Sequence, residues 1–387
     1  MISIVFVSNF FNHHEKPFCD ELNALEDVDF RFVQTEEMTA DRVKLGWGED
    51  LSRFPYVVCA YGNNNEREKA LALCRDADIL ILGSAPYDFV AERVKGNSPT
   101  FYYAERLFRK GIWHMLNPGT FLAVMKRFVL PGRKSNFYLL AASGYTAYDT
   151  ARIGAFNCRR FKWGHFIDTA SCVSRNFENK TVKLLWVGRF LQLKHPEYPV
   201  KAARSLKDRG VDFHLDIIGT GPEEERIRKM IAGFDLGEFV TLHGSMSPGD
   251  VRGYMERADI YMFTSDFNEG WGAVLGEAMA SGCAVVASHA AGATTFLARH
   301  GENALIYKSG DYASFESQVI RLVEASDMRK RLSEAAVATM RDLWAPRVAA
   351  RRFSTVCKAI CEGKAIPYFG EGPMSEARIL KNNWFEG

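Results

Sequence analysis

Residues 266–282 read DFNEGWGAVLGEAMASG, and this stretch decides how the second half of the chain folds. It follows the apolar run 260–263 and ends at Gly282, a residue typical of helix C-termini. We therefore predict a strand at 260–263, then a glycine-rich turn, then a helix. Glu269 falls in the turn and Glu277 falls inside the helix, so the two carboxylates belong to different elements.

The amino-terminal end of this helix predicts an anion site. Backbone N–H groups near Gly272, Ala273 and Val274 have no partner within the helix, and the helix dipole adds partial positive charge. They suit an anion such as a diphosphate, with a carboxylate on either side to hold hydroxyls. A capped surface helix without a ligand is the alternative. Gly276 argues against it, because glycine inside a helix costs about 1 kcal/mol relative to Ala unless another group approaches the backbone closely.

Residues 269–282, EGWGAVLGEAMASG, resemble the element EGFGxxxxEAMAxG of the retaining glycosyltransferases of family 4, also called group 1 glycosyltransferases. The resemblance extends from about Lys183 to Asp311 and continues more weakly to Trp344. It implies the α/β fold class named GT-B, in which two Rossmann-like domains face each other across a deep cleft. It further implies a nucleotide-sugar donor on the C-terminal domain, an acceptor on the N-terminal domain, and a C-terminal helix that crosses back to the N-terminal domain.

Length and composition fit two globular domains of ordinary size. The chain has 387 residues, of which 47% are hydrophobic and 25% charged, and its net charge of +2 gives no strong attraction to nucleic acid. No apolar run approaches the roughly 20 residues that span a bilayer, and the start lacks the basic flank of a signal peptide, so we expect a cytoplasmic protein. The eight cysteines form no CxxC pair, which favours reduced, mostly buried thiols over a metal site.

Both halves of the chain alternate short β-rich runs with helical segments, which predicts two parallel sheets covered by helices. The predicted strands are 2–8, 28–33, 55–60, 78–83, 99–103 and 136–141, followed by 182–187, 213–218, 239–242, 260–263, 284–287 and 304–307. The polar stretch 167–180 is the expected linker. We therefore expect an acceptor domain at 1–170 with about 345–387, which includes the closing helix 347–362, and a donor domain at 181–344.

Two cations follow the first strand of the second half, in the order Gly188, Arg189 and then Lys194, where the family has Gly-Arg and a Lys a few residues later. The resemblance places both cations at the diphosphate. Arg offers a planar fork and Lys a point charge, and together they can neutralise the leaving group as a metal ion would elsewhere. We therefore expect no metal or other cofactor, although Asp266 leaves room for an acidic metal ligand.

The resemblance also assigns roles in the glycine-rich stretch. It implies that Glu269 lies near the donor sugar ring and that Glu277 accepts hydrogen bonds from ribose hydroxyls, with Gly270 and Trp271 in the donor-binding loop. A retaining transfer needs an oxocarbenium-like centre to be stabilised while the nucleotide diphosphate leaves. Spacing does not decide whether Glu269 attacks as a nucleophile, and a same-face substitution assisted by the leaving phosphate is the preferred mechanism.

Further loops are expected to line the nucleotide. Gly219 and Gly221 end a strand and precede a helix start, and Gly244 follows the next strand, where the family places the nucleotide and its base. The loop 288–295 departs from the family pattern, because Ala291 replaces a glycine and Thr295 replaces a glutamate.

Candidates in the first half have weaker support. The first loop lacks GxGxxG, which disfavours a dinucleotide-binding oxidoreductase, and its His13 or His14 is a candidate contact for the acceptor or the donor phosphate. Solvent-exposed histidines at a helix start are the alternative. Glu105 follows a predicted strand and is a candidate to orient or deprotonate the acceptor hydroxyl, whereas an ion pair with Arg106 or Arg109 would leave it a surface residue.

Basic residues alternate with aromatic ones at 126–128, 133–137 and 159–163 in the first half. Such runs suit an anionic membrane surface, and hence a lipid-linked acceptor, or else they are simply solvated faces. A peripheral position on the inner face of the membrane is the corresponding expectation. Nucleic acid is disfavoured because no recognised binding module accompanies the runs.

The sequence thus predicts a metal-independent, retaining glycosyltransferase that uses a nucleoside-diphosphate sugar of the UDP or GDP type. Its acceptor would be a glycan or a lipid-linked molecule, in polysaccharide or lipid-linked glycan synthesis. Two alternatives stay open: a nucleotide-sugar epimerase of the same fold, and a non-catalytic binding or assembly subunit with a degenerate donor pocket. Thr295 and the unusual first loop are the features that favour the second alternative.

Overall fold

The computed structural model describes residues 1–39, 43, 48–109, 111–168, 177 and 181–386. It divides into two compact α/β units, one formed by Met1–Phe166 with Leu343–Lys381 and the other by Ile167–Asp342 with Asn382–Gly387. Most of the expected linker, 167–180, lies outside the described residues. In the described part of the chain, no helix is both long enough and apolar enough to cross a bilayer.

The sheet of the first unit has the strand order β3-β2-β1-β4-β5-β6-β7, and neighbouring strands run parallel. The four residues of β4 are all buried, as expected for a central strand covered on both faces. The strands are β1 (Ile2–Ser8), β2 (Val28–Gln34), β3 (Val57–Cys59), β4 (Ile79–Leu82), β5 (Thr100–Ala104), β6 (Phe137–Ala141) and β7 (Arg160–Lys162).

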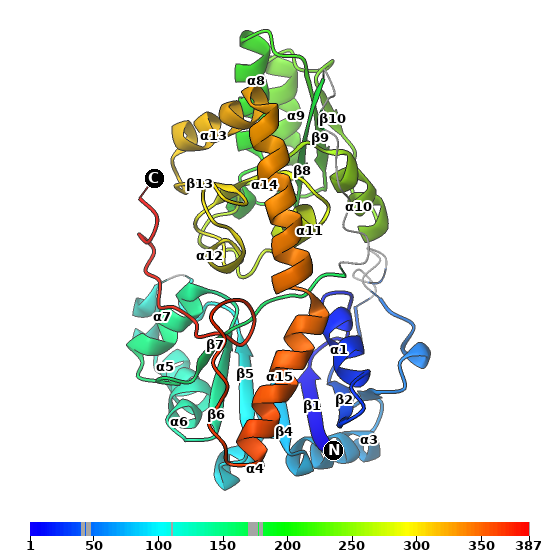
Figure 1. The fold of residues 1–387 in the computed structure, drawn as a ribbon, viewed down its shortest axis with the longest axis vertical. Helices are drawn as coiled ribbons and strands as arrows, with labels where there is room; N and C mark the ends of the chain where they lie inside the picture. The colour runs from blue at the N-terminus through cyan, green and yellow to red at the C-terminus, as the bar shows by residue number, and fades with distance from the viewer. Residues whose placement is uncertain (40–42, 44–47, 110, 169–176, 178–180, 387) are drawn as a thin grey trace. The chain divides into compact units, whose positions relative to one another are not determined.

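Seven helices flank this sheet in the described part of the unit: α1 (Lys16–Asn23), α3 (Asn64–Asp76), α4 (Asp88–Gly96), α5 (Pro118–Val124), α6 (Leu130–Gly132), α7 (Gly144–Arg152) and α15 (Pro346–Cys361). α1 and α15 lie side by side (Figure 1). Phe353 of α15 packs on Phe18 of α1 and on Phe101 of β5, with ring centroids 5.9 and 4.9 Å apart. The closing helix therefore completes the core of the first unit, as the resemblance implied.

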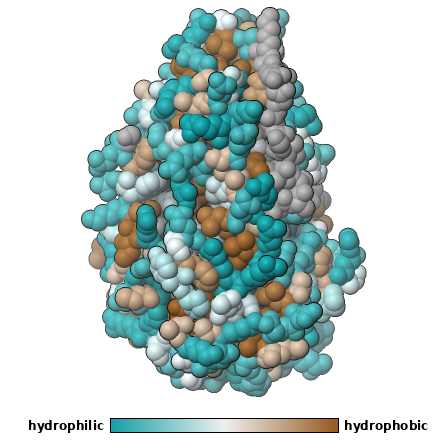
Figure 2. Space-filling view, viewed as in Figure 1, coloured by the Kyte–Doolittle hydropathy of each residue, from teal (hydrophilic) through white to brown (hydrophobic). Residues whose placement is uncertain are grey.

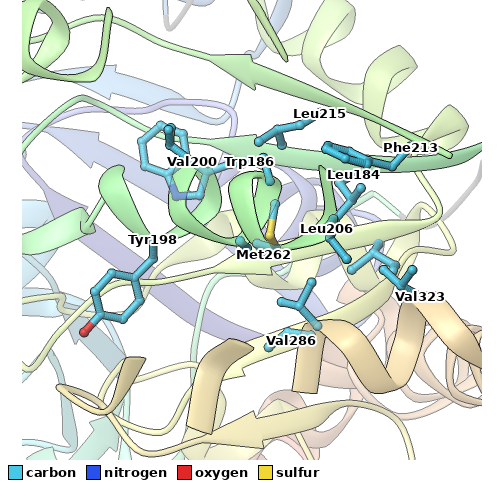
Figure 3. Close-up of a cluster of buried hydrophobic side chains, with 14 of the residues drawn as sticks. Leu184, Trp186, Tyr198, Val200, Leu206, Phe213, Leu215, Met262, Val286 and Val323 are labelled. Carbon is cyan, nitrogen blue, oxygen red and sulfur yellow. The ribbon is translucent and has the colours of Figure 1, made fainter. Parts of the chain in front are cut away.

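The sheet of the second unit has the order β10-β9-β8-β11-β12-β13, and neighbouring strands are again parallel. Its core is one cluster of buried side chains in which Trp186 of β8 and Met262 of β11 lie beside Val200 and Leu206 (Figure 3). The strands are β8 (Val182–Val187), β9 (Phe213–Ile218), β10 (Val240–Leu242), β11 (Ile260–Phe263), β12 (Ala284–Ser288) and β13 (Leu305–Tyr307).

The helices of the second unit are α8 (Glu197–Asp208), α9 (Glu224–Gly233), α10 (Pro248–Arg257), α11 (Ala273–Ala280), α12 (Thr294–Leu297), α13 (Tyr312–Glu324) and α14 (Ser326–Ala338). α14 packs on α11 and α13 (Figure 1). Each strand is joined to the next through a helix, which is the connection that parallel neighbours require.

The structure confirms all predicted strands, with ends that differ by at most two residues, and adds β7. The expectation that residues 159–163 form a basic, membrane-facing run was wrong. Arg160 is 8% exposed and donates hydrogen bonds to Ala155 O and Asn157 Oδ1, both at 2.7 Å. Trp163 is buried, and so is Phe137 of the run 133–137, because it belongs to β6. Because the Arg160 guanidinium is hydrogen-bonded to oxygens inside the protein, its charge is not available to a membrane surface.

Candidate functional site

The residues predicted to bind the donor follow successive strands of the second sheet. Gly188 and Arg189 come directly after β8, Gly219 after β9, Gly244 after β10, and Glu269 lies in the loop after β11. These strands are neighbours in the order β10-β9-β8-β11. Because the carboxyl ends of parallel strands meet at one edge of a sheet, the loops form a single group at that edge.

Lys194 and Glu269 form an ion pair between the loops after β8 and β11. Their side chains are only 17% and 15% exposed, and Ser265 Oγ donates a second hydrogen bond, of 2.9 Å, to the same Glu269 oxygen. The pair therefore fixes the position of the Glu269 carboxylate. The resemblance placed Lys194 on a diphosphate and Glu269 at a sugar ring, and the structure brings the two side chains together.

The backbone under this pair is also bound across the two loops. Asp266 N donates to Leu193 O at 2.9 Å, and Thr264 Oγ1 donates to Lys194 O at 2.5 Å. Trp186 Nε1, inside the core, donates in turn to Thr264 Oγ1 at 2.8 Å. These hydrogen bonds through Thr264 thus anchor the loop that carries Lys194 to the buried core.

Arg189 differs from Lys194 in its surroundings. It is exposed, and no residue in the described ranges forms an ion pair or a side-chain hydrogen bond with it. An exposed arginine at the carboxyl edge of a parallel sheet has the chemistry that an anionic ligand requires.

His195 joins two carboxylates next to this pair, an arrangement that the sequence analysis missed. Its backbone is left-handed, with φ of 47°, and its ring nitrogens lie 2.9 Å from Glu197 Oε1 and 3.7 Å from Asp266 Oδ2. Asp266 and Glu197 raise the pKa of His195 to about 9, so the ring is a cation at neutral pH. Asp266, which the sequence left open as a metal ligand, also accepts a hydrogen bond of 2.7 Å from Asn268 N.

Gly272 is the N-cap of α11 and needs the absence of a side chain. Its φ is 86°, and a Cβ there would lie 2.5 Å from Phe263 Cζ. The preceding carbonyls of Gly270 and Trp271 accept hydrogen bonds from Gly292 N and Ala293 N, at 3.1 and 2.8 Å. The side chain of Trp271 is 1% exposed, so this residue offers a ligand its backbone only. The amides of Ala273 and Val274 begin the helix directly after the turn.

The other glycines of the site pack against the protein itself. A Cβ on Gly219 would lie 1.9 Å from Gly188 O, and one on Gly221 would lie 2.7 Å from Phe190 O. These glycines let the loops after β8 and β9 touch, backbone to backbone. At Gly276 the group that comes close is Ile167 Cδ1, 2.7 Å from the position of a Cβ, so the close approach predicted there is made by a protein side chain.

Two further groups complete this edge of the second unit. Glu277 of α11 is half-buried, and burial raises its pKa to about 7, against the opposite effect of Arg252. No described residue of the second unit forms a hydrogen bond with its carboxylate. Next to Gly244, His243 Nε2 lies 2.6 Å from Asp216 Oδ1, and Gly244 itself has a φ of 73° with open space on its Cβ side.

The first unit contains a cavity of about 360 Å³ at the carboxyl ends of β1, β4 and β5. This volume is in the range of small-molecule sites. The lining is mixed, with carboxylates, arginines, a histidine and aromatic rings: Ser8, Asn9, Glu15, Leu82, Gly83, Ser84, Tyr102, Tyr103, Ala104, Glu105, Leu107, Arg109, Arg127, Phe128 and His165.

Two half-buried residues of this cavity are neutral at neutral pH. Burial raises the pKa of Glu15 to about 8, and Glu15 Oε2 is buried without a hydrogen-bond partner among the described residues. Burial lowers the pKa of His165 to about 4, and the Tyr103 hydroxyl lies 3.5 Å from its ring nitrogens. The sequence analysis missed both residues. Its only signal for Glu15 was a position directly after His13 and His14.

The candidates from the first half lie in or near this cavity. Glu105 lines it and forms an ion pair with Arg109, which is the alternative that the sequence left open. His13 and His14 are not part of the lining. Their rings lie 3.9 Å apart, and the ring of His14 is 5.0 Å from that of His165.

Comparison with known proteins supports the reading of the second unit. Residues 172–339 match the family model described as "Glycosyl transferases group 1". The chain is 32% identical over 145 residues to D-inositol 3-phosphate glycosyltransferase of Pseudarthrobacter chlorophenolicus, covering 35% of this chain and 34% of that protein. It is 31% identical over 112 residues to the putative colanic acid biosynthesis glycosyltransferase WcaL of Escherichia coli, covering 28% of each. The chain therefore matches about a third or less of the length of these relatives.

The fold is shared more widely than the sequence. The crystal structure of HepE of Anabaena in complex with UDP has a TM-score of 0.71 to this chain at 14% identity, and the match covers 93% of this chain and all of that one. The same protein has also been solved with UDP-glucose. At this level of identity the likeness establishes the fold, which is GT-B. Residues 172–339 thus match the group 1 glycosyltransferases in sequence, and the chain has the GT-B fold.

Proposed function

We propose that this protein is a retaining glycosyltransferase that moves a sugar from a UDP-type nucleotide sugar to a hydroxyl of a glycan or lipid-linked acceptor. The observation that carries the proposal is the Lys194–Glu269 pair together with the exposed Arg189 of the same loop as Lys194, at the edge of the second sheet where α11 begins. This group of residues combines cations for a diphosphate with a fixed carboxylate for a sugar. The UDP complexes of HepE support the choice of nucleotide.

Each donor-side residue has a role in this proposal. Arg189 and Lys194 neutralise the diphosphate, and the amides of Ala273 and Val274 add the partial charge of the α11 N-terminus. Glu277 accepts hydrogen bonds from the ribose hydroxyls. Binding of the diphosphate draws Lys194 away from Glu269. The Glu269 carboxylate then faces the sugar ring and holds it. With two cations at the diphosphate, the transfer needs no metal ion.

The proposed chemistry is a same-face substitution. The bond between the anomeric carbon and the phosphate oxygen breaks, and the electron pair leaves with the diphosphate. The acceptor oxygen bonds to the same face of the anomeric carbon, and its proton passes to the leaving phosphate oxygen. Stabilisation of the growing negative charge by Arg189 and Lys194 lowers the barrier, because these contacts strengthen in the transition state.

We place the acceptor in the cavity of the first unit. Neutral Glu15 can donate a hydrogen bond from its carboxyl group and accept one, which suits a sugar hydroxyl. The aromatic rings of Tyr102, Tyr103 and Phe128 offer apolar faces of the kind that sugar rings pack on. Similarity to the putative colanic acid biosynthesis glycosyltransferase WcaL supports polysaccharide synthesis as the setting.

The test is donor binding across a panel of UDP-, GDP- and ADP-sugars, measured by calorimetry on the native protein and on Arg189→Ala and Glu277→Ala. Arg228→Ala is the matched control, because Arg228 is an exposed arginine of the same unit paired with Glu224 on α9. We expect one UDP-sugar to bind, both site variants to lose at least about tenfold in affinity, and the control to bind normally. A folded protein that binds none of the sugars would refute the proposal. Proton NMR of the product then tests whether the configuration at the anomeric carbon is retained. Release of UDP that depends on an added sugar acceptor distinguishes transfer from epimerisation.

A further inference from the structure

Residues 382–386 pack on the second unit, although Leu343–Lys381 belongs to the first. The segment reads NNWFE, so two large aromatic residues stand next to each other in a polar stretch. Hydrophilic residues cover most of the face drawn in Figure 2, which is the ordinary state of a protein surface. Trp384 and Phe385 are instead half-buried. They pack on residues that follow β12, in the loop 289–293, here called the β12 loop.

His289, the first residue of the β12 loop, is the centre of this contact. Its side chain is buried, with 3% of the residue exposed. The centroid of its ring lies 6.3 Å from that of Trp384 and 6.1 Å from that of Phe385, which is within the range of aromatic pairs. The ring of Phe385 also lies 5.4 Å from that of His300. Two neighbouring aromatic side chains therefore cover one buried histidine.

Both ring nitrogens of His289 form hydrogen bonds. Ser309 N donates to Nδ1 at 2.9 Å, so Nδ1 is the nitrogen without a hydrogen. Nε2 carries the hydrogen and donates it to Asn382 O at 3.0 Å. Burial lowers the pKa of His289, which keeps the ring neutral and this pattern intact at neutral pH. Residues 382–386 thus fix the orientation of His289 by a hydrogen bond as well as by ring contacts.

The β12 loop in turn contacts the loop 264–272, here called the Glu269 loop. The ring of Phe267 meets that of His289 edge-on, with centroids 5.2 Å apart and an interplanar angle of 85°. Two amides of the β12 loop donate to backbone oxygens of the Glu269 loop: Gly292 N to Gly270 O at 3.1 Å, and Ala293 N to Trp271 O at 2.8 Å. The contacts lie before and after Glu269 in the sequence, so they restrain the loop on both sides of the carboxylate.

Glu269 needs such support during the proposed transfer. Binding of the diphosphate draws Lys194 away, and the ion pair then no longer holds the carboxylate. Ser265 Oγ still donates to it at 2.9 Å from the start of the loop. Phe267 and Gly270, the residues near Glu269 on either side, stay restrained by the β12 loop. The position of the carboxylate then depends on that loop.

We infer that residues 382–386, acting through His289, position the Glu269 loop for the proposed transfer. Trp384 and Phe385 are positioning residues, because they act on Glu269 through His289 and Phe267. The inference rests on the proposed function for the role of the carboxylate. The coupling between residues 382–386 and the Glu269 loop is a property of the fold, and it can be measured without turnover.

The first measurement is hydrogen exchange, followed by mass spectrometry, on the full chain. It compares native protein with Trp384→Ala combined with Phe385→Ala, here called the double variant. We expect peptides from the Glu269 loop and the β12 loop to exchange at least about tenfold faster in the double variant, because local opening exposes amides such as those of Gly292 and Ala293. Peptides from β8 and β9 should exchange as in native protein, which shows that the second unit stays folded.

The second measurement is the rate of sugar transfer in two backgrounds. The double variant should lower kcat at least about tenfold in native protein, because the carboxylate is less often in its working position. In Glu269→Gln the same change should alter the remaining kcat by no more than about twofold, since the group that it positions is already gone. A loss of folded protein would instead lower both rates by the same factor.

Two controls accompany these measurements. Trp384→Phe with Phe385→Tyr keeps an aromatic ring at each position, and it should restore native exchange and native kcat. Tyr368→Ala removes an aromatic side chain that is 85% exposed, and it should change neither. Circular dichroism and thermal unfolding confirm that each variant is folded.

Two results would overturn the inference. One is native exchange in both loops of the double variant. The other is an equal fractional loss of kcat in native protein and in Glu269→Gln, which would mean that the aromatic residues act on stability alone. If native protein transfers no sugar, the proposed function fails by itself, and the exchange rates decide whether residues 382–386 hold the Glu269 loop.

Discussion

Lys194 and Glu269 are far apart in the sequence, and they meet in a mostly buried ion pair that joins the loops after β8 and β11. Ser265 binds the same carboxylate oxygen from the second loop. The pair fixes one charge of each sign at the edge of the sheet where the donor is proposed to bind. The contribution of the pair to the free energy of unfolding and its role in turnover can be measured separately.

A double-mutant cycle on Lys194→Ala and Glu269→Ala tests the pair. Each single variant should lose about 2 kcal/mol of unfolding free energy, because it leaves a mostly buried charge without its partner. The double variant should lose at least about 1 kcal/mol less than the sum. Urea unfolding provides the values. The exposed pair Arg204–Asp208 is the control, with an expected coupling below about 0.5 kcal/mol.

Turnover should respond differently from stability. Every variant of Lys194 or Glu269, including Glu269→Gln, should lose about a hundredfold or more in kcat, because in the proposed mechanism these charges act on the transition state. Transfer of radiolabelled sugar measures the loss. Native kcat in folded Glu269→Ala would show that the carboxylate has no part in the reaction.

The pH dependence of stability tests the cluster around His195. Asp266 and Glu197 raise the pKa of His195 from 6.5 to about 9, so the protonated ring stabilises the fold by at most about 3 kcal/mol. This contribution is complete below about pH 6.5 and is lost as the pH rises through about 9. His195→Asn tolerates the left-handed backbone and does not titrate. We expect the stability difference between native protein and this variant to shrink between pH 6.5 and 9.5, as measured by urea unfolding. A difference that stays constant would exclude the raised pKa.

The turn before α11 depends on the space at Gly272. Gly272 and Gly310 have nearly equal φ angles, 86° and 84°, but only Gly272 has a neighbour, Phe263, where a Cβ would go. Gly310→Ala should cost about 1 kcal/mol, the penalty of the backbone conformation alone. Gly272→Ala should cost at least about 2 kcal/mol more, because Phe263 must move in a packed core. Thermal unfolding compares them, and equal costs would show that the contact is unimportant.

Glu15 offers a second pH test, on the cavity of the first unit. Its pKa of about 8 means that the carboxyl group is protonated at neutral pH, so Glu15→Gln reproduces its charge and shape. The unfolded carboxyl ionises near pH 4.5, so native protein loses stability relative to Glu15→Gln from about pH 4.5 upward, until the pH passes about 8. Urea unfolding at several pH values measures this widening gap. Parallel stability curves would mean that Glu15 is ionised in the fold.

Local patterns made the fold predictable. Strands such as β1 and β11 were found because a run of apolar residues between turn signals identifies a buried strand without knowledge of its neighbours. β7 was missed because two of its three residues, Arg160 and Lys162, are cations, which a sequence pattern assigns to the surface. Arg160 is buried, and Ala155 O and Asn157 Oδ1, in the turn just before the strand, accept its hydrogen bonds.

The candidate site rests on similar patterns. Glu269 and Glu277 were chosen by their order and spacing and stay predictions, whereas the grouping of the loops after β8, β9 and β11 follows from the topology of a parallel sheet. The glycines were interpreted less well, since Gly276 makes room for Ile167. Whether a glycine makes room for a ligand or for a protein side chain depends on the group that packs against it. That group is known only from the tertiary structure.

The sequence by itself determined the alternation of strands and helices, the family motif and the ends of the strands, because these depend on neighbours along the chain. Tertiary structure decided which charges are paired and which groups are neutral. Burial from distant segments keeps Glu15 and His165 uncharged, and two carboxylates keep His195 charged. Pairing and desolvation arise between residues that only folding brings together, and they set the protonation states with which the site must work.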